Sequence, residues 1–191
     1  MNFQEVIHTW IDLIFKPKEV IAKKNEEMTK NPKLSFWEYI ALPLIFIYVL
    51  LIALMLIQQS NFSVSSLIGL IFVFILIFIV ICFSLVMFGG VLFVISKLLG
   101  GRGKFANILF LLTLMLPFIL TTTALGSLVR PDIFGTVGSL LIMIAGIVFL
   151  IYSYYLVFLI VRESQKLSTP KALGIMVVLF IINILLTVFK F

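Results

Sequence analysis

Charge is scarce in this chain. Only 12% of its 191 residues are charged, against roughly 25% in soluble domains, while 63% are hydrophobic and 20 are phenylalanines. A chain with this balance has too few polar side chains to cover an apolar core, which excludes an ordinary soluble domain. The sequence therefore predicts an integral membrane protein.

Cysteine and histidine are almost absent. The one cysteine, Cys82, lies inside an apolar run, so no intramolecular disulfide can form, and the thiol is expected to pack rather than react. The one histidine, His8, has no cluster of cysteines or carboxylates positioned to join it as a metal ligand. The sequence therefore predicts no metal site and no cofactor.

Ionisable residues are missing from the interior of every long apolar run. A helix needs about 20 mainly apolar residues to cross a bilayer, and five runs qualify. Proton pathways and intramembrane hydrolases need acids, bases or metals inside the membrane. The absence of ionisable residues from the apolar runs therefore argues against a proton-coupled transporter and against an enzyme. The predicted spans are residues 37–57, 67–96, 105–128, 137–161 and 171–189.

The second run is too long for a simple span. Residues 67–96 would extend about 45 Å as one helix, well beyond a hydrocarbon core of about 30 Å. The Gly89-Gly90 pair is the expected place for a bend or for a close contact with another helix. Whether the run is one long helix or is broken at this pair stays open at this point.

The basic residues are distributed unevenly. All of the 14 lysines and arginines except Arg130 and Lys190 fall in the N-terminal segment and in the loops after the second and fourth runs. Because cytoplasmic loops are enriched in these residues, the N-terminus is predicted to be cytosolic and, with five spans, the C-terminus outside. The same cations would lie along anionic lipid head groups, and no soluble basic face supports nucleic-acid binding.

The N-terminal segment, residues 1–35, is predicted to be a cytosolic amphipathic helix followed by a basic connector. The helix should stop near Lys16, because Pro17 disfavours the helical conformation in the residue before it, and residues 19–33 then read as solvated chain. This helix has two possible roles: its apolar face packs on the membrane or under the bundle, or its exposed face docks onto a cytosolic partner. Its apolar positions repeat with helical spacing: Phe3, Val6, Ile7, Trp10, Ile11 and Ile14.

Milder polar groups do occur inside the predicted spans. Pro117 should kink the third span, with the hydroxyls of Thr121 to Thr123 able to satisfy freed carbonyls. A second group lies at mid-depth of the fourth span and in the fifth, where it either packs in the bundle or lines a cavity. This candidate intramembrane polar cluster consists of Tyr152, Ser153, Tyr154, Tyr155 and Asn183.

The stretch "KLLGGRGKF", residues 97–105, combines glycines and cations like a phosphate-binding loop. It does not have the spacing of a nucleotide P-loop, and it follows a predicted membrane span rather than the strand that a dinucleotide fingerprint requires. It is therefore predicted to be a tight turn that ends the second span. Lys97, Arg102 and Lys104 are the candidate contacts for a lipid phosphate or an acidic protein partner.

These landmarks, in order, resemble the Ypt-interacting-protein (Yip) domain family over nearly the whole chain. The resemblance rests on "FKPKEV", on "LLGGRGKF" with its glycine pair and following aromatic, on "MLPFIL" and on "STPKALG". It implies a single polytopic bundle with a cytosolic N-terminus. Eukaryotic members are associated with Rab-type GTPases, membrane trafficking and oligomerisation; this chain is similar to compact prokaryotic-type members, for which a cell-membrane location is expected.

The sequence is compatible with two functions. The first is a non-enzymatic scaffold or adaptor that binds a cytosolic or membrane protein, or a second copy of itself, at a basic inner face. The second is a small transporter or lipid-translocating protein that uses a polar groove in the bundle. Both share one predicted fold class: an all-α polytopic membrane bundle of five transmembrane helices plus an N-terminal amphipathic helix.

Overall fold

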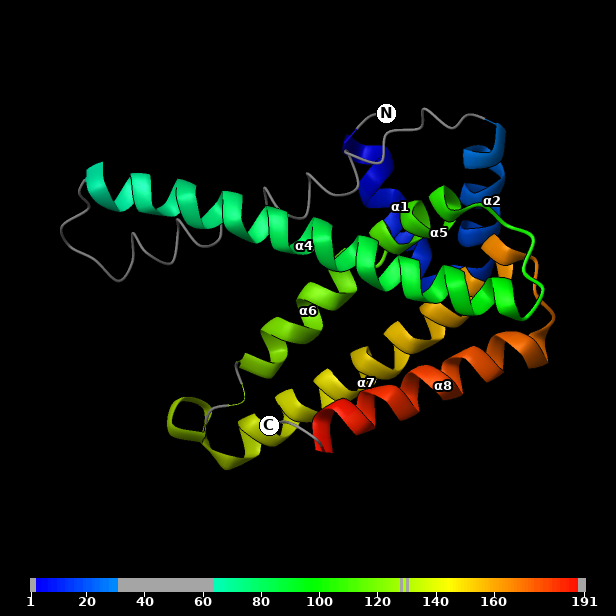
Figure 1. Ribbon diagram of the computed structural model, residues 1–191. Coiled ribbons are helices and arrows are strands. Elements are labelled where there is room, and N and C mark those ends of the chain that lie inside the picture. Colours follow the sequence, from blue (N-terminus) through cyan, green and yellow to red (C-terminus); the bar gives the residue numbers. More distant parts are fainter. Residues whose placement is uncertain (1–2, 31–63, 128, 130, 189–191) are drawn as a thin grey trace.

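The computed structural model describes residues 3–30, 64–127, 129 and 131–188, and all the regular structure in these residues is helical (Figure 1). The predicted first span, residues 37–57, lies outside the described residues. The helices are α1 (Phe3–Phe15), α2 (Pro17–Lys30), α4 (Val64–Leu98), α5 (Phe105–Thr113), α6 (Leu116–Ser127), α7 (Pro131–Gln165) and α8 (Thr169–Val188).

Two described helices are long and apolar enough to cross a bilayer, Ile71–Leu98 and Gly135–Gln165. A third span results if the bent pair Phe105–Thr113 and Leu116–Thr122 counts as one, whereas Thr169–Ile182 is apolar but short. The described residues therefore contain two or three candidate spans, and the count of five stays a prediction. At 1.5 Å per residue the two long helices extend about 42 and 46 Å, so each must tilt strongly or project beyond a core of about 30 Å.

The second predicted span is one helix. α4 runs without interruption through Gly89 and Gly90. Gly89 is buried against α5, where an added Cβ would lie 2.8 Å from Cδ2 of Leu109, while a Cβ at Gly90 would meet nothing. The glycine pair therefore does not break α4, and Gly89 instead allows a close contact with α5.

The third predicted span is kinked, as Pro117 indicates. α5 and α6 meet at a bend of 50°, and Pro117 is the second residue of α6, where a missing N–H costs little. The Oγ1 atoms of Thr121 and Thr122 donate to the carbonyls of Pro117 and Phe118, at 2.7 and 2.9 Å. These carbonyls belong to α6 itself, so the hydroxyls do not serve carbonyls freed at the end of α5.

The prediction of a solvated connector after α1 was wrong. α1 does end at Phe15, but Pro17 then starts a second helix, because the first turn is where a helix tolerates proline. Ile21, Lys24 and Met28 form a buried stripe at helical spacing along α2. As for α1, Val6 and Leu13 are buried while Ile11, Ile14 and Phe15 are exposed, so its amphipathic character stays a prediction.

α1 and α2 form a hairpin that lies against the rest of the bundle (Figure 1), and hydrogen bonds join the two. The hydroxyl of Tyr152 on α7 donates to the carbonyl of Leu13, at 2.5 Å, near the end of α1. Nδ2 of Asn107 on α5 donates to Oδ1 of Asn25 at 2.8 Å, and Nδ2 of Asn25 donates to the carbonyl of Glu163 at 3.1 Å. The hairpin is thus joined to α5 and to α7 at positions remote in the sequence.

A buried lysine also joins the two helices of the hairpin. Lys24 is only 5% exposed, a position in which an unpaired charge would be costly. Its ammonium donates to Oε2 of Glu27 at 2.8 Å and lies 3.7 Å from Oε1 of Glu5 on α1. These carboxylates compensate the charge, so Lys24 occupies the apolar stripe of α2 as an ion-paired residue.

The bundle has two unlike ends. All the apolar side chains that are buried in the described part of the chain fall within residues 6–28, 85–118 and 156–175. We call this the loop end; it contains α1, α2, α5, the last turns of α4 and α7 and the start of α8. We call residues 71–84, 119–127, 135–151 and 177–182 the open end, where α4 diverges from α7 and α8 (Figure 1) and large apolar side chains are exposed.

Candidate functional site

The glycine-rich turn after α4 has the geometry of a helix stop. Gly100 has φ of 87°, a left-handed conformation that favours glycine. The N–H of Gly100 donates to the carbonyl of Lys97 at 3.0 Å, and that of Gly101 to the carbonyl of Ser96 at 2.8 Å. This pair of bonds is a Schellman motif, so the glycines do end the helix that precedes them.

The next glycines let the turn pack directly on the end of α7. The N–H of Arg102 donates to the carbonyl of Gln165 at 2.9 Å. A Cβ on Gly103 would lie 1.8 Å from the carbonyl oxygen of Ser164, and one on Gly101 would lie 2.8 Å from that of Ser96. Gly101 and Gly103 are therefore required by close contacts with backbone atoms of α4 and α7.

Three polar side chains that the sequence did not point to lie buried at this contact. Ser96, Ser164 and Gln165 are at most 1% exposed, and in the described part of the structure their side-chain oxygens and nitrogens have no hydrogen-bond partner. Gln165 lies against both Gly101 and Gly103. In the sequence, Ser164 and Gln165 follow an apolar run, and this position predicts exposed loop residues rather than buried ones.

The candidate contacts Lys97, Arg102 and Lys104 are all exposed. The structure joins their loop to the one between α7 and α8, because the ammonium of Lys171 donates to the carbonyl of Leu99 at 2.7 Å. Exposed Lys166, which directly follows α7 and has a positive φ of 52°, belongs to this second loop. We call these five cations the basic loop patch: Lys97, Arg102, Lys104, Lys166 and Lys171.

Charges next to the basic loop patch leave it positive. Lys97 lies over the ring of Phe93, with Nζ 5.3 Å from the centroid. The nearby carboxylate of Glu163 is already paired with Arg162, whose Nη2 lies 2.5 Å from Oε1. The patch therefore presents a net positive surface at the loop end.

The side chains of the predicted polar cluster that the structure describes have different surroundings, although the ring centroids of Tyr152 and Tyr155 lie 6.2 Å apart. Tyr152 bonds to α1, as described above, and Tyr155 is exposed and stacks on Phe158 with the ring centroids 6.5 Å apart. Ser153 and Tyr154 line a pocket. Asn183 lies within α8, but its side chain is outside the described part.

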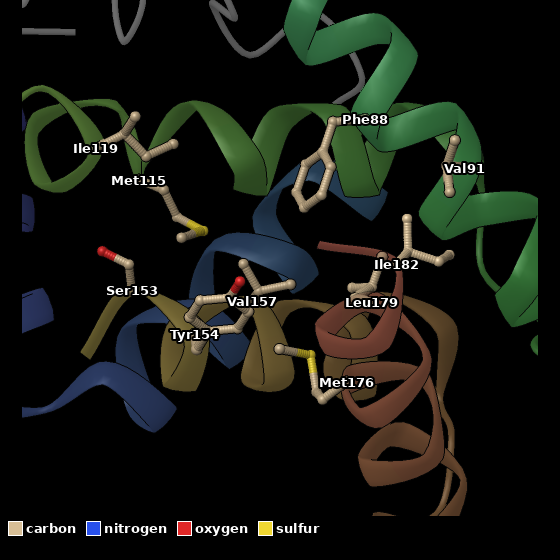
Figure 2. A pocket seen from close by; sticks show the side chains of 10 residues that line it. All are labelled: Phe88, Val91, Met115, Ile119, Ser153, Tyr154, Val157, Met176, Leu179 and Ile182. Atoms are coloured by element: carbon tan, nitrogen blue, oxygen red, sulfur yellow. The ribbon is translucent and has the colours of Figure 1, made fainter. Parts of the chain in front are cut away.

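The pocket lies where α4, the bend between α5 and α6, α7 and α8 meet (Figure 2). Its volume is about 390 Å³, within the range of small-molecule sites. Apart from Ser153 and Tyr154 the lining is apolar, and the hydroxyl of Ser153 donates to the carbonyl of Phe149 at 2.8 Å. Phe88, Met115 and Met176 point into the space between the helices (Figure 2).

The described residues include few side chains that could act as metal ligands, acids, bases or nucleophiles. No three His, Cys, Asp or Glu side chains of these residues come close enough to hold a metal ion. His8 is exposed on α1. Cys82 is half-buried within α4.

These features define a class: an integral membrane protein made of apolar helices, with a packed loop end and a basic surface. The chain belongs to the Yip1 domain family, since the model of that domain matches residues 11–190. Members of this family are generally non-enzymatic membrane proteins. No curated protein and no solved structure matches the chain.

Proposed function

We propose that the protein is a non-enzymatic scaffold or adaptor, and that the basic loop patch binds an acidic surface of a protein partner at the cytosolic face of the membrane. The observation that carries the proposal is the joining of two loops, far apart in the sequence, into one exposed positive surface. Single-sign patches of this kind attract partners of opposite charge and orient them as they approach.

The way the patch is held also supports binding. Its turn is fixed by the backbone bond from Arg102 to Gln165 and by the Schellman motif at Gly100. A surface that is already ordered loses little conformational entropy when a partner docks. Belonging to a family of non-enzymatic membrane proteins is consistent with a role in binding rather than in catalysis.

A transporter has less support. A transport path for a polar solute or a lipid head group needs polar groups along a groove, because polar groups are costly to move through an apolar environment. The pocket is lined mainly by apolar side chains, and its serine hydroxyl is already bonded to a backbone carbonyl. These features favour a scaffold over a transporter.

Charge reversal on matched surfaces tests the proposal. In one variant Lys97, Arg102 and Lys104 are changed to Glu; in the control Lys18, Lys23 and Lys30, which are exposed on α2, are changed to Glu. A photo-reactive amino acid at Lys166 captures the partner in cells. We expect a cross-linked product with the wild-type protein and the control, and none with the loop variant.

Two results would contradict the scaffold. One is equal capture by the loop variant and the wild-type protein. The other is flux of lipid or solute above that of empty vesicles, from purified protein reconstituted without any partner, because such flux would favour the transporter.

A further inference from the structure

We infer that the pocket between α4, α7 and α8 is a binding site for one anionic phospholipid, with an acyl chain in the pocket and the phosphate against Lys171. This inference does not depend on the proposed function. It rests on the lining of the pocket, on its opening and on the cation beside it.

The lining selects a hydrocarbon occupant. Side chains from α4, α6, α7 and α8 and from the α5–α6 bend line the space, and the hydroxyl of Ser153 donates to the carbonyl of Phe149. A polar occupant would lose its bonds to water and find few replacements, whereas an alkyl chain would keep van der Waals contacts on several sides. Met115 and Met176 are flexible side chains that can adapt to such a chain.

The pocket opens to the surface that faces lipid. Four of its lining residues, Phe88, Val91, Ile119 and Ile182, are between 40% and 43% exposed. They lie on α4, α6 and α8, and they are continuous with the exposed apolar side chains of the open end. An acyl chain can therefore enter sideways from the bilayer.

One cation, Lys171, lies at the loop side of the same space. It precedes Met176 by five residues on α8, about 8 Å along the axis. Lys171 reaches from α8 to the carbonyl of Leu99, so its ammonium lies at the junction of these two helices. A phosphate at this level would meet the positive charge while its acyl chain extended into the pocket.

The probes are phosphatidylglycerol and phosphatidylcholine that carry a photo-reactive diazirine on one acyl chain, each in nanodiscs with the full-length protein. Met176→Trp fills the pocket, and Val178→Trp places the same bulk on an exposed position of α8 outside the lining. Lys171→Gln removes the charge and leaves the pocket open.

We expect phosphatidylglycerol to label peptides around Met115, Val157 and Met176 in the wild-type protein and in Val178→Trp, and not in Met176→Trp. Lys171→Gln should weaken labelling by phosphatidylglycerol about fivefold, because one interfacial lysine contributes about 1 kcal/mol to anionic lipid binding. Labelling of Met176→Trp equal to the wild type would overturn the pocket site. Equal labelling of the wild-type protein by both lipids would overturn the anionic head group, and that comparison needs no variant to fold.

Discussion

The loop end and the open end of the bundle differ in what holds them together. At the loop end Phe110, Leu111 and Leu156 are fully buried, and hydrogen bonds connect α2 and α1 to α5 and α7. At the open end Phe72 is 66% exposed and Phe83 is 65% exposed, on the part of α4 that diverges from α7 and α8. One end has a core of its own, whereas the other has a surface that only an apolar environment can cover.

The difference indicates where each part lies relative to the bilayer. An exposed apolar surface of this extent is unfavourable in water and is expected to face lipid. The two long helices are longer than the hydrocarbon core is thick, so their ends can project and carry the packed loop end outside it. That the loop end faces the cytosol stays a prediction from the distribution of lysines and arginines.

The largest expected contrast is between two phenylalanines. Phe110→Ala should lower the free energy of unfolding by about 3–5 kcal/mol, because it opens a cavity in the core of the loop end. Phe83→Ala should change it by less than about 0.5 kcal/mol, because that side chain faces lipid or detergent in both states. Unfolding by denaturing detergent in mixed micelles measures both. Similar losses for the two variants would abolish the distinction between the ends.

A second contrast uses glycines. Gly103→Ala should cost about 3 kcal/mol, because its Cβ would overlap the carbonyl oxygen of Ser164 and the turn would have to leave α7. In Gly174→Ala the new methyl meets nothing within 4 Å, and alanine favours the helix by up to about 1 kcal/mol. Thermal unfolding in detergent compares them. A Gly103→Ala protein as stable as the wild type would show that the turn is not docked as described.

A smaller effect is expected at the contact between α7 and α1. Tyr152→Phe removes the hydroxyl that donates to Leu13 and should cost about 1 kcal/mol. Tyr155→Phe is the matched control, since that ring is exposed on the same helix. Proteolysis of the N-terminal hairpin, together with unfolding in detergent, reports the difference. If the two variants were proteolysed and unfolded alike, the hydroxyl of Tyr152 would not contribute to holding α1 on α7.

The smallest effect should come from pH. The ammonium of Lys30, 2.7 Å from Glu26, lowers the pKa of that carboxyl below its usual 4.5, and Glu26 raises the pKa of Lys30 above its usual 10.5. Their stabilisation of α2 is therefore present between these values and is lost on further acidification or on further addition of base. Both groups are exposed, so water and salt weaken the effect. Helicity of α2 followed by hydrogen exchange against pH should change only slightly, and a large loss near neutral pH would contradict this assignment.

Much of the bundle could be predicted from the sequence, because its signals are local. Long runs without charge predict apolar helices, Gly100 predicts the stop of α4, and Pro117 predicts the bend between α5 and α6. Each of these rests on neighbours within a few residues along the chain. The same logic predicted where α1 would end.

The rest depends on partners that are distant in the sequence. α2 was missed because Lys24 and Asn25, which read as solvated residues, are held by Glu5 and Asn107. Pro17 at the first helical position, Glu19 in the first turn and the spacing of Ile21 and Met28 were the available signals for a helix. Likewise, no local pattern connects Tyr152 with Leu13 or Lys171 with Leu99.

The central claim is that the N-terminal hairpin is docked on the loop end through α2. The most direct test removes the one native thiol by Cys82→Ser, introduces the pair Asn25→Cys and Asn107→Cys, and treats the protein in membranes with a short cross-linker that carries two thiol-reactive groups. We predict an intramolecular cross-link, because the two side chains are in hydrogen-bond contact, and none for the control pair Lys23→Cys and Asn107→Cys, since Lys23 is exposed on α2. Failure of the first pair to cross-link, or equal cross-linking by both pairs, would contradict the docked hairpin.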